Sequence, residues 1–427
     1  MIDLPPPRLT TLDNGLRIVS ERMPGLASSS LGVFVGAGAR VEAGHEHGIA
    51  HLLEHMAFKG TRRRSARHIV EEIEAVGGDI NAATSMEQTA YYARVLEDDL
   101  PLALDILADI VTASVFAPDD LAREKAVIRQ EIAAVQDTPD DIVFESLQAA
   151  AFTNQPLGRS ILGTDRSVAG FTRSDIEGFL RRHYVAGDVV IAAAGAIDHD
   201  ALVADVTRHF ASLPSGQAAS LPQARFIGGT VLDRRDLEQV NIALALPSVG
   251  VEDDQVHAAR IFATLLGGGM SSRLFQEVRE KRGLCYNVSA FQWGYAGIGL
   301  LGVHAATAPE DVVDLVTVIR EETARAAHEC TREEIDRAKA QLRAGLIMSL
   351  ENSSARADRL ARQLLVFGEL RDAATVISDL DAVTVDEVHA SAQRIIEDGR
   401  LALSAIGPES ALGGLEAVMP EKPRPQH

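Results

Sequence analysis

The sequence predicts an α+β fold made of two homologous α/β-sandwich domains, each a mostly antiparallel sheet packed with helices. The chain has 427 residues, which is too long for one ordinary core and suggests two domains of about 200 residues each. Strand-like runs alternate with amphipathic helical runs in both halves. The segment that begins at Asp119 recurs 214 residues later at Glu333, with acidic, aliphatic, Arg and Lys positions coinciding. This repeat indicates an internal duplication.

The boundary between the two copies is predicted at residues 214–224. This segment is polar and turn-rich, with Pro214-Ser215-Gly216 and Pro222. We expect a first domain at 1–213, a linker at 214–224 and a homologous second domain at 225–427.

Composition excludes some classes of function. There are 61 acidic and 41 basic residues, for a net charge of −20, which repels nucleic acid and anionic membrane surfaces. We therefore expect no nucleic-acid or membrane partner. The acidic charge could line a chamber that attracts basic peptides, or it could serve solubility alone, and the sequence leaves both open.

Neither the targeting signals nor the cysteine content of the sequence indicates a secreted protein. No basic segment followed by an apolar one opens the chain, and no apolar run is long enough to cross a membrane, so a cytoplasmic protein is expected. The two cysteines, Cys285 and Cys330, lie in different predicted elements and are expected to be free thiols.

Local patterns predict the elements of the first half in order. A turn at Asp13-Asn14-Gly15 separates two strands, Gly77-Gly78 stops a helix, and Pro118-Asp119-Asp120 starts another. The predicted strands lie within 10–22 and at 31–36, 79–85, 89–96 and 189–194, and the predicted helices lie at 65–76, 100–114, 119–136, 140–152, 173–183 and 200–210.

The strongest chemical signal is the stretch His51-Leu52-Leu53-Glu54-His55. On a helix of 3.6 residues per turn, His51 and His55 point off the same face, as two ligands of one metal ion must. Glu54 directly precedes the second His, which is the order of the inverted zincin motif. Two imidazoles and an adjacent carboxylate suit activation of water by zinc, with the acid as base. His45 and His47 lie in a glycine-flanked loop before this helix and are expected to be bystanders.

A third ligand must come from elsewhere, and the helix at 119–136 offers Glu124 and Glu131. They are seven residues apart and share one face. In the duplicated register they fall on Ala338 and Gly345, and the region 258–270, where the motif should recur, contains no His and no acid. The acids and the His pair are therefore missing together, which associates both acids with the motif. A solvated charged face remains the alternative.

The second copy carries different candidates. Gly267-Gly268-Gly269 lacks the Lys-Ser/Thr end of a phosphate loop, so a tight turn into a helix is expected. Arg279 and Tyr286 are either ordinary surface residues or donors to a peptide backbone or an oxyanion. Helices are predicted at 309–327, 332–350 and 353–367, and a disordered tail after Pro420.

These residues resemble the pitrilysin-type inverzincin peptidases over nearly the whole chain, and the bacterial processing-peptidase-like proteins related to the mitochondrial processing peptidase β-subunit most of all. The resemblance implies one zinc per chain, held by His51, His55 and a Glu 76 positions after the second His, which is Glu131. It also implies Glu54 as the base and Glu124 as a second, supporting acid.

The same resemblance implies how substrate and subunits are arranged. Asn81-Ala82-Ala83 looks like the edge strand that pairs with bound peptide. Arg279 and Tyr286 match the family's Arg and Tyr, which serve the metal site of the other subunit. A homodimer with shared active sites is therefore implied.

We thus expect a zinc-dependent endopeptidase that cleaves short or unfolded peptides inside a dimeric chamber. The alternatives are a catalytically silent assembly subunit of a larger complex with the same fold, and a small-molecule metal lyase built on one half-unit. The ligand set also suits manganese or cobalt.

Overall fold

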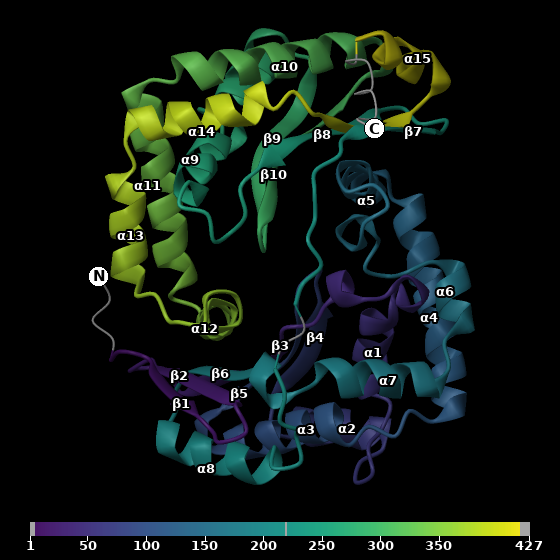
Figure 1. Cartoon of the computed structure of the whole chain (residues 1–427), viewed down its shortest axis with the longest axis vertical. Coiled ribbons are helices and arrows are strands. Elements are labelled where there is room, and N and C mark those ends of the chain that lie inside the picture. The colour runs from purple at the N-terminus through teal and green to yellow at the C-terminus, as the bar shows by residue number, and fades with distance from the viewer. Residues whose placement is uncertain (1–4, 218–219, 419–427) are drawn as a thin grey trace. The chain divides into compact units, whose positions relative to one another are not determined.

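The computed structural model describes residues 5–217 and 220–418, and they form two units that are each discontinuous in sequence (Figure 1). Unit 1 comprises Met1–Ala133, Arg159–Pro222 and Ile347–Leu370, and unit 2 comprises Ala134–Gly158, Gln223–Leu346 and Arg371–His427. Each unit thus includes one segment from the other half of the chain. The boundaries expected at 1–213 and 225–427 stay a prediction, and the tail predicted after Pro420 lies outside the described residues.

Unit 1 is built on a six-stranded sheet with the order β1-β2-β6-β3-β5-β4. Strands β2 and β6 are parallel and all other neighbours are antiparallel. The strands are β1 (Arg8–Thr11), β2 (Arg17–Arg22), β3 (Ser28–Val35), β4 (Asp79–Thr84), β5 (Thr89–Leu96) and β6 (Val189–Gly195). The helices are α1 (Ile49–Ala57), α2 (Ala66–Ala75), α3 (Leu100–Thr112), most of α4 (Pro118–Asp137), α6 (Asp165–Gly170), α7 (Arg173–His183), α8 (His199–His209) and α12 (Ser353–Phe367).

Both faces of this sheet are buried. Alternate residues of β3, such as Val33 and Val35, join a large core with α1, α3 and α7. Phe34 points to the opposite face, where it packs with Leu360 and Leu364 of α12. Helix α12 comes from the second half of the sequence but lies against β2, β3 and β6 (Figure 1).

Unit 2 is built on a five-stranded sheet with the order β7-β11-β8-β10-β9, in which only β7 and β11 are parallel within the described strands. The strands are β7 (Gly229–Arg234), β8 (Val240–Ser248), β9 (Cys285–Tyr295), β10 (Ile298–Thr307) and β11 (Ala402–Gly407). The helices are α5 (Pro139–Ala151), α9 (Val256–Gly267), α10 (Val312–Glu329), most of α11 (Arg332–Ser349), α13 (Ala373–Ala382), α14 (Val385–Glu397) and α15 (Glu409–Val418). Helix α5, from the first half of the sequence, packs on β7, β8 and β11.

The two sheets confirm the duplication. Without β1, the order β2-β6-β3-β5-β4 repeats as β7-β11-β8-β10-β9, with the parallel pair at the same place. Helices α4 and α11 begin at Pro118 and Arg332, which preserves the 214-residue offset read from the sequence.

Most predicted elements are confirmed, and the differences are local. The strand expected at 31–36 begins earlier, at Ser28, because the polar Ser28-Ser29-Ser30 run still pairs with β5. The helix expected from 309 opens with a 3₁₀ turn before α10. The three glycines end α9 and begin the expected turn, and the helical segment that follows is a π-helix at Phe275–Lys281. Among the described residues, no helix has both the length and the apolarity to cross a membrane.

Candidate metal centre

Helix α1 begins at a glycine and is capped by a distant carboxylate. Gly48 has φ of 93° and a Cβ there would lie 2.7 Å from Gly163 Cα, so only glycine fits this turn. The backbone N–H groups of Gly48 and Ala50 donate to Glu42 at 2.8 and 2.9 Å, and they satisfy the first turn where the N-cap offers no side chain. Burial raises the pKa of Glu42 to about 8, against the lowering effect of these hydrogen bonds.

The apolar face of α1 fixes where its histidines point. Leu52, Leu53 and Met56 are buried in the core of unit 1. His51 and His55 therefore project from the other face, and their ring centroids are 4.6 Å apart. The helix anchors both imidazoles on a rigid element.

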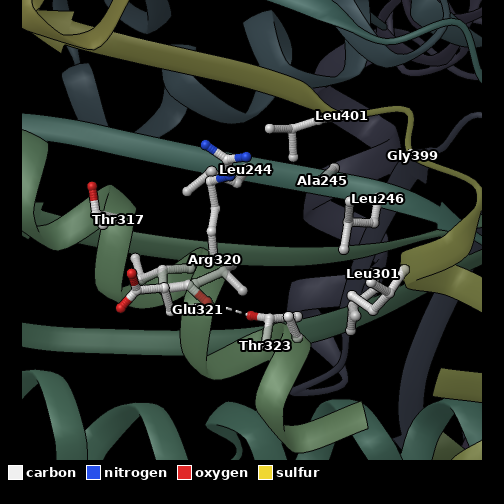
Figure 2. Close-up of a pocket in the computed structure, with 14 residues that line it drawn as sticks. Leu244, Ala245, Leu246, Leu301, Thr317, Arg320, Glu321, Thr323, Gly399 and Leu401 are labelled. Atoms are coloured by element: carbon white, nitrogen blue, oxygen red, sulfur yellow. Dashed lines mark hydrogen bonds between the residues drawn. The ribbon is translucent and has the colours of Figure 1, made fainter. Parts of the chain in front are cut away.

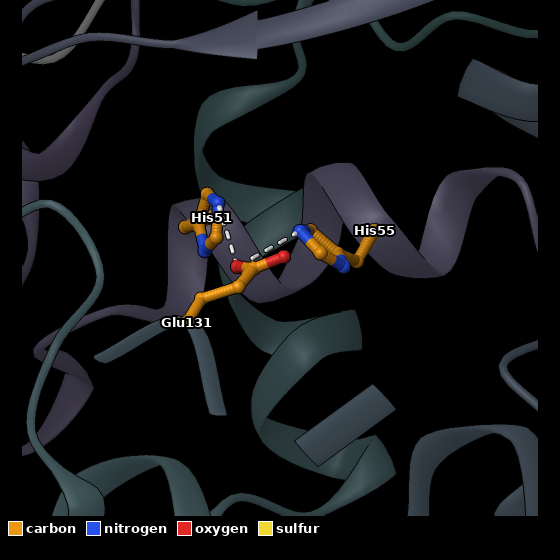
Figure 3. A group of neighbouring side chains, drawn as sticks. All are labelled: His51, His55 and Glu131. Atoms are coloured by element: carbon orange, nitrogen blue, oxygen red, sulfur yellow. Dashed lines mark ion pairs between the residues drawn. The ribbon is translucent and has the colours of Figure 1, made fainter. Parts of the chain in front are cut away.

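Helix α4 brings Glu131 to the two histidines (Figure 3). Glu131 Oε2 lies 3.6 Å from His55 Nε2 and 3.9 Å from His51 Nε2. One ligand atom from each of the three residues lies within 4.8 Å of the others. Bonds of about 2.0–2.1 Å to a tetrahedral zinc place ligand atoms roughly 3.3–3.5 Å apart. The three donors therefore fit zinc after small side-chain adjustments.

Glu124 lies behind this group. Its Oε2 is 3.1 Å from His55 Nδ1, and its Oε1 is 2.9 Å from Lys59 Nζ. A carboxylate at Nδ1 favours the tautomer whose Nε2 lone pair is free for a metal. Glu124 is buried, and it is not one of the three residues whose ligand atoms converge.

The protonation of His51 also suits a ligand. Burial, followed by the neighbouring His55, lowers the pKa of His51 to about 4, so its imidazole is neutral at neutral pH. Its Nδ1 is buried and has no hydrogen-bond partner among the described residues.

Glu54 is held by the end of strand β4. The Thr84 hydroxyl donates to Glu54 Oε2 at 2.5 Å. Burial raises the pKa of Glu54, and hydrogen bonds from Thr84 oppose that shift. A partly desolvated carboxylate of this kind suits a general base.

Strand β4 is an edge of the sheet in unit 1 and contains Asn81, Ala82 and Ala83. Asn81 and Ala83 are exposed, and Ala82 is buried. The Ala82 N–H donates to the Asn81 side-chain oxygen at 2.8 Å. An edge strand offers unpaired main-chain groups to an extended peptide.

Arg279 and Tyr286 lie together in unit 2. The Arg279 guanidinium lies over the rings of Phe275 and Tyr286, at 4.7 and 4.5 Å from their centroids. Tyr286 is 80% exposed. Cation–π contacts with both rings restrain the Arg279 guanidinium.

Three supporting residues were not found from the sequence: Glu42, Lys59 and Thr84. Lys59 lies four residues after His55, a spacing that could have suggested a shared partner, whereas no local signal links Glu42 or Thr84 to the centre. His45 and His47 are outside the three-residue group, and His47 instead contacts the Ser160 carbonyl oxygen at 2.8 Å.

A large apolar cavity of about 470 Å³ lies elsewhere, in unit 2 (Figure 2). Its walls come from β8, β10 and α10, with Leu244, Leu301 and Val303 among them. It contains none of the site residues, and size alone does not make it the reaction site.

Comparisons with known proteins agree with this geometry. Residues 17–165 match the family model described as insulinase, peptidase family M16, and residues 170–342 match the model for the M16 inactive domain. The chain belongs to peptidase family M16. An M16 relative from Streptomyces coelicolor, named as an uncharacterized zinc protease, is 40% identical over 94% of this chain and 89% of its own length.

Other M16 relatives span the chain equally well. A protein of the same description from Mycobacterium tuberculosis is 41% identical, over 95% of this chain and 94% of its own. A crystal structure described as the M16 inactive domain from Pseudomonas fluorescens shares the fold, with a TM-score of 0.87 and 23% identity over 94% of this chain and 98% of its own. The family models and the zinc-protease relatives show that this chain is a zinc metallopeptidase.

Proposed function

We propose that this protein is a zinc-dependent endopeptidase that cleaves short or unfolded peptides inside a chamber formed by a homodimer. The observation that carries the proposal is the convergence of His51, His55 and Glu131, with Glu54 beside them. A silent assembly subunit would not need this complete set.

The chemistry follows from the roles of these side chains. His51, His55 and Glu131 would hold the zinc, which when bound supplies Lewis acidity toward water and the scissile carbonyl. Glu54 would take a proton from the attacking water and pass it to the leaving amine. Glu124 would keep His55 in the metal-binding tautomer.

Substrate and subunit roles complete the proposal. An extended peptide would pair with β4 along Asn81, Ala82 and Ala83. Arg279 and Tyr286 would donate to the peptide backbone and the oxyanion in the active site of the partner subunit.

Metal content and cleavage of a mixed quenched-peptide library test the reaction. We expect Glu54→Gln to retain zinc and to lose about 10²–10⁴-fold in kcat, the usual share of a general base. Cleavage by Glu54→Gln at the wild-type rate would overturn the mechanism. No zinc and no cleavage in either protein would favour the silent subunit.

Mixing two inactive variants tests the shared site. Glu54→Gln and Tyr286→Phe subunits should recover about a quarter of wild-type activity, because half of the dimers are hybrids with one intact site. No recovery after subunit exchange would contradict the trans arrangement.

A further inference from the structure

Thr84 links the two functional parts of unit 1. It is the last residue of edge strand β4, and its hydroxyl donates to Glu54 Oε2 at 2.5 Å. Glu54 itself lies on α1, which packs against β4. One residue of the strand therefore contacts the carboxylate directly.

The position of Thr84 depends on the conformation of the edge strand. On one side β4 is paired with β5, where Thr84 lies opposite Thr89. Its other side is the edge of the sheet, and there the Ala82 N–H is occupied by the Asn81 side chain. A peptide that pairs with this edge would extend the ladder and restrict the strand as far as Thr84.

The second copy provides independent support. Strands β6 and β11 correspond, and they end at Gly195 and Gly407. When these two glycines are aligned, the pairing of residues across each sheet places Gln292 of β9 at the position of Thr84 of β4. Helix α9, which corresponds to α1, contains no Asp or Glu. Gln292 donates instead to the Val249 carbonyl oxygen at 3.0 Å. The threonine and the carboxylate are thus absent together.

We infer that Thr84 is a positioning residue that couples the seating of a peptide on β4 to the orientation of Glu54. This inference rests on the proposed function. A carboxylate aligned by a bound peptide is in place when the scissile bond arrives, and small misalignments of a base are costly in rate. Peptides that cover more of β4 should therefore be cleaved with a higher kcat, beyond any gain in binding.

The test compares Thr84→Val, which keeps the shape and strand propensity, with Thr84→Ser, which keeps the hydroxyl. Thr11→Val is the matched control, since Thr11 is an exposed threonine on β1 at the opposite edge of the same sheet. Two quenched peptides are used, one short and one extended by four residues toward β4. Zinc content and melting temperature are measured for each variant.

We expect Thr84→Val to lose about tenfold or more in kcat on the extended peptide, as for a hydrogen bond to a charged group. KM and zinc content should stay at wild-type values. The kcat gain from extending the peptide should shrink in Thr84→Val and persist in Thr84→Ser and Thr11→Val. If Thr84→Val does not fold, Thr84→Ala takes its place.

Three results would overturn the inference in distinguishable ways. If Thr84→Val has wild-type kcat values on both peptides while Glu54→Gln is inactive, the coupling is contradicted and the proposed function is still supported. Cleavage by Glu54→Gln at the wild-type rate would sink both. A loss in Thr84→Val that Thr84→Ser does not rescue would mean that the hydroxyl has no positioning role.

Discussion

The metal face of unit 1 and its counterpart in unit 2 show how one scaffold can hold or lose a reaction centre. In unit 1, His51, His55 and Glu124 join α1 to α4. In unit 2 the corresponding helix α9 has no acidic residue and α11 has Ala338 at the position of Glu124, and Leu265, Gly269 and Ala338 line one small cavity there.

In unit 2 an ion pair links the segment after α9 to α11, whereas in unit 1 the candidate metal ligands link α1 to α4. Arg273 forms two hydrogen bonds with Glu334 of α11, at 2.7 and 2.8 Å. Burial favours a raised pKa for Glu334, but the hydrogen bonds from Arg273 and Thr331, together with the charges of Arg273 and Arg337, outweigh it and lower the pKa. The comparison indicates that polar side chains link these two helical segments in both units. Among the described residues, only those of unit 1 form a group of His, Cys, Asp or Glu side chains that could hold a metal ion.

Removing both imidazoles from unit 1 is the largest test of this comparison. The double substitution His51→Leu and His55→Gly should abolish zinc binding and lower kcat/KM by at least about 10³-fold. Zinc analysis and peptide cleavage measure the effect, with circular dichroism to show that the fold persists. Gly269→Ala, in the small cavity of unit 2, is the control and should keep both properties. One zinc per chain in the double variant would contradict the ligand assignment.

The apolar core between each sheet and its helices offers a second contrast between the units. Tyr91 is buried in unit 1 and its hydroxyl is 2.8 Å from that of Tyr184. The sheet registers place Val303, which lines the apolar cavity of unit 2, at the same position.

Tyr91→Val should therefore lower the free energy of unfolding by about 3 kcal/mol, because it leaves a void and an unpaired Tyr184 hydroxyl. Val303→Phe should change it by less than about 1 kcal/mol, because the cavity already has room for the ring. Urea unfolding measures both. Equal losses from the two substitutions would show that the two cores are packed alike.

The ion pair of unit 2 should contribute to stability alone. Arg273→Met should cost about 2 kcal/mol, since it strands the largely buried Glu334 carboxylate, and the double variant with Glu334→Met should cost less. Unfolding curves for the single and double variants isolate the pair. Zinc content should remain at one per chain. A loss of zinc would contradict the expectation that this ion pair does not affect the metal centre of unit 1.

A separate expected effect is a pH dependence of stability that arises from Asp188, the residue immediately before β6. Burial raises the pKa of Asp188 to about 7, against the lowering effect of Arg17. The folded state thus binds this proton more tightly than the unfolded state, so stability falls as pH rises from about 4 to 7 and levels off above.

Asp188→Asn should remove this contribution, which has a slope of at most about 1.4 kcal/mol per pH unit. The counterpart Arg400 bonds to Asp398 at 2.6 Å, so Arg400→Gln should leave the slope between pH 4 and 7 unchanged. Thermal unfolding across this range measures the difference between the variants. A wild-type slope in Asp188→Asn would contradict the assignment.

The sequence by itself determined the features that depend on local spacing. The interval from His51 to His55 places two imidazoles on one helix face whatever the rest of the chain does. The 214-residue repeat predicted the duplication, and most helices and strands followed from periodicity and glycine or proline signals, because these act within a few residues.

Only the tertiary structure decided which distant groups meet. Glu124 and Glu131 share a face of α4, and nothing in their spacing says which one reaches the histidines and which one bonds to His55 Nδ1. The sequence likewise did not show that α5, from the first half of the chain, covers the sheet of unit 2, or that α12, from the second half, covers the sheet of unit 1. An apolar helix face does not specify the sheet that it covers. The same holds for the histidine helix: its sequence places the base, but the packing of α1 against β4 supplies the threonine that holds it.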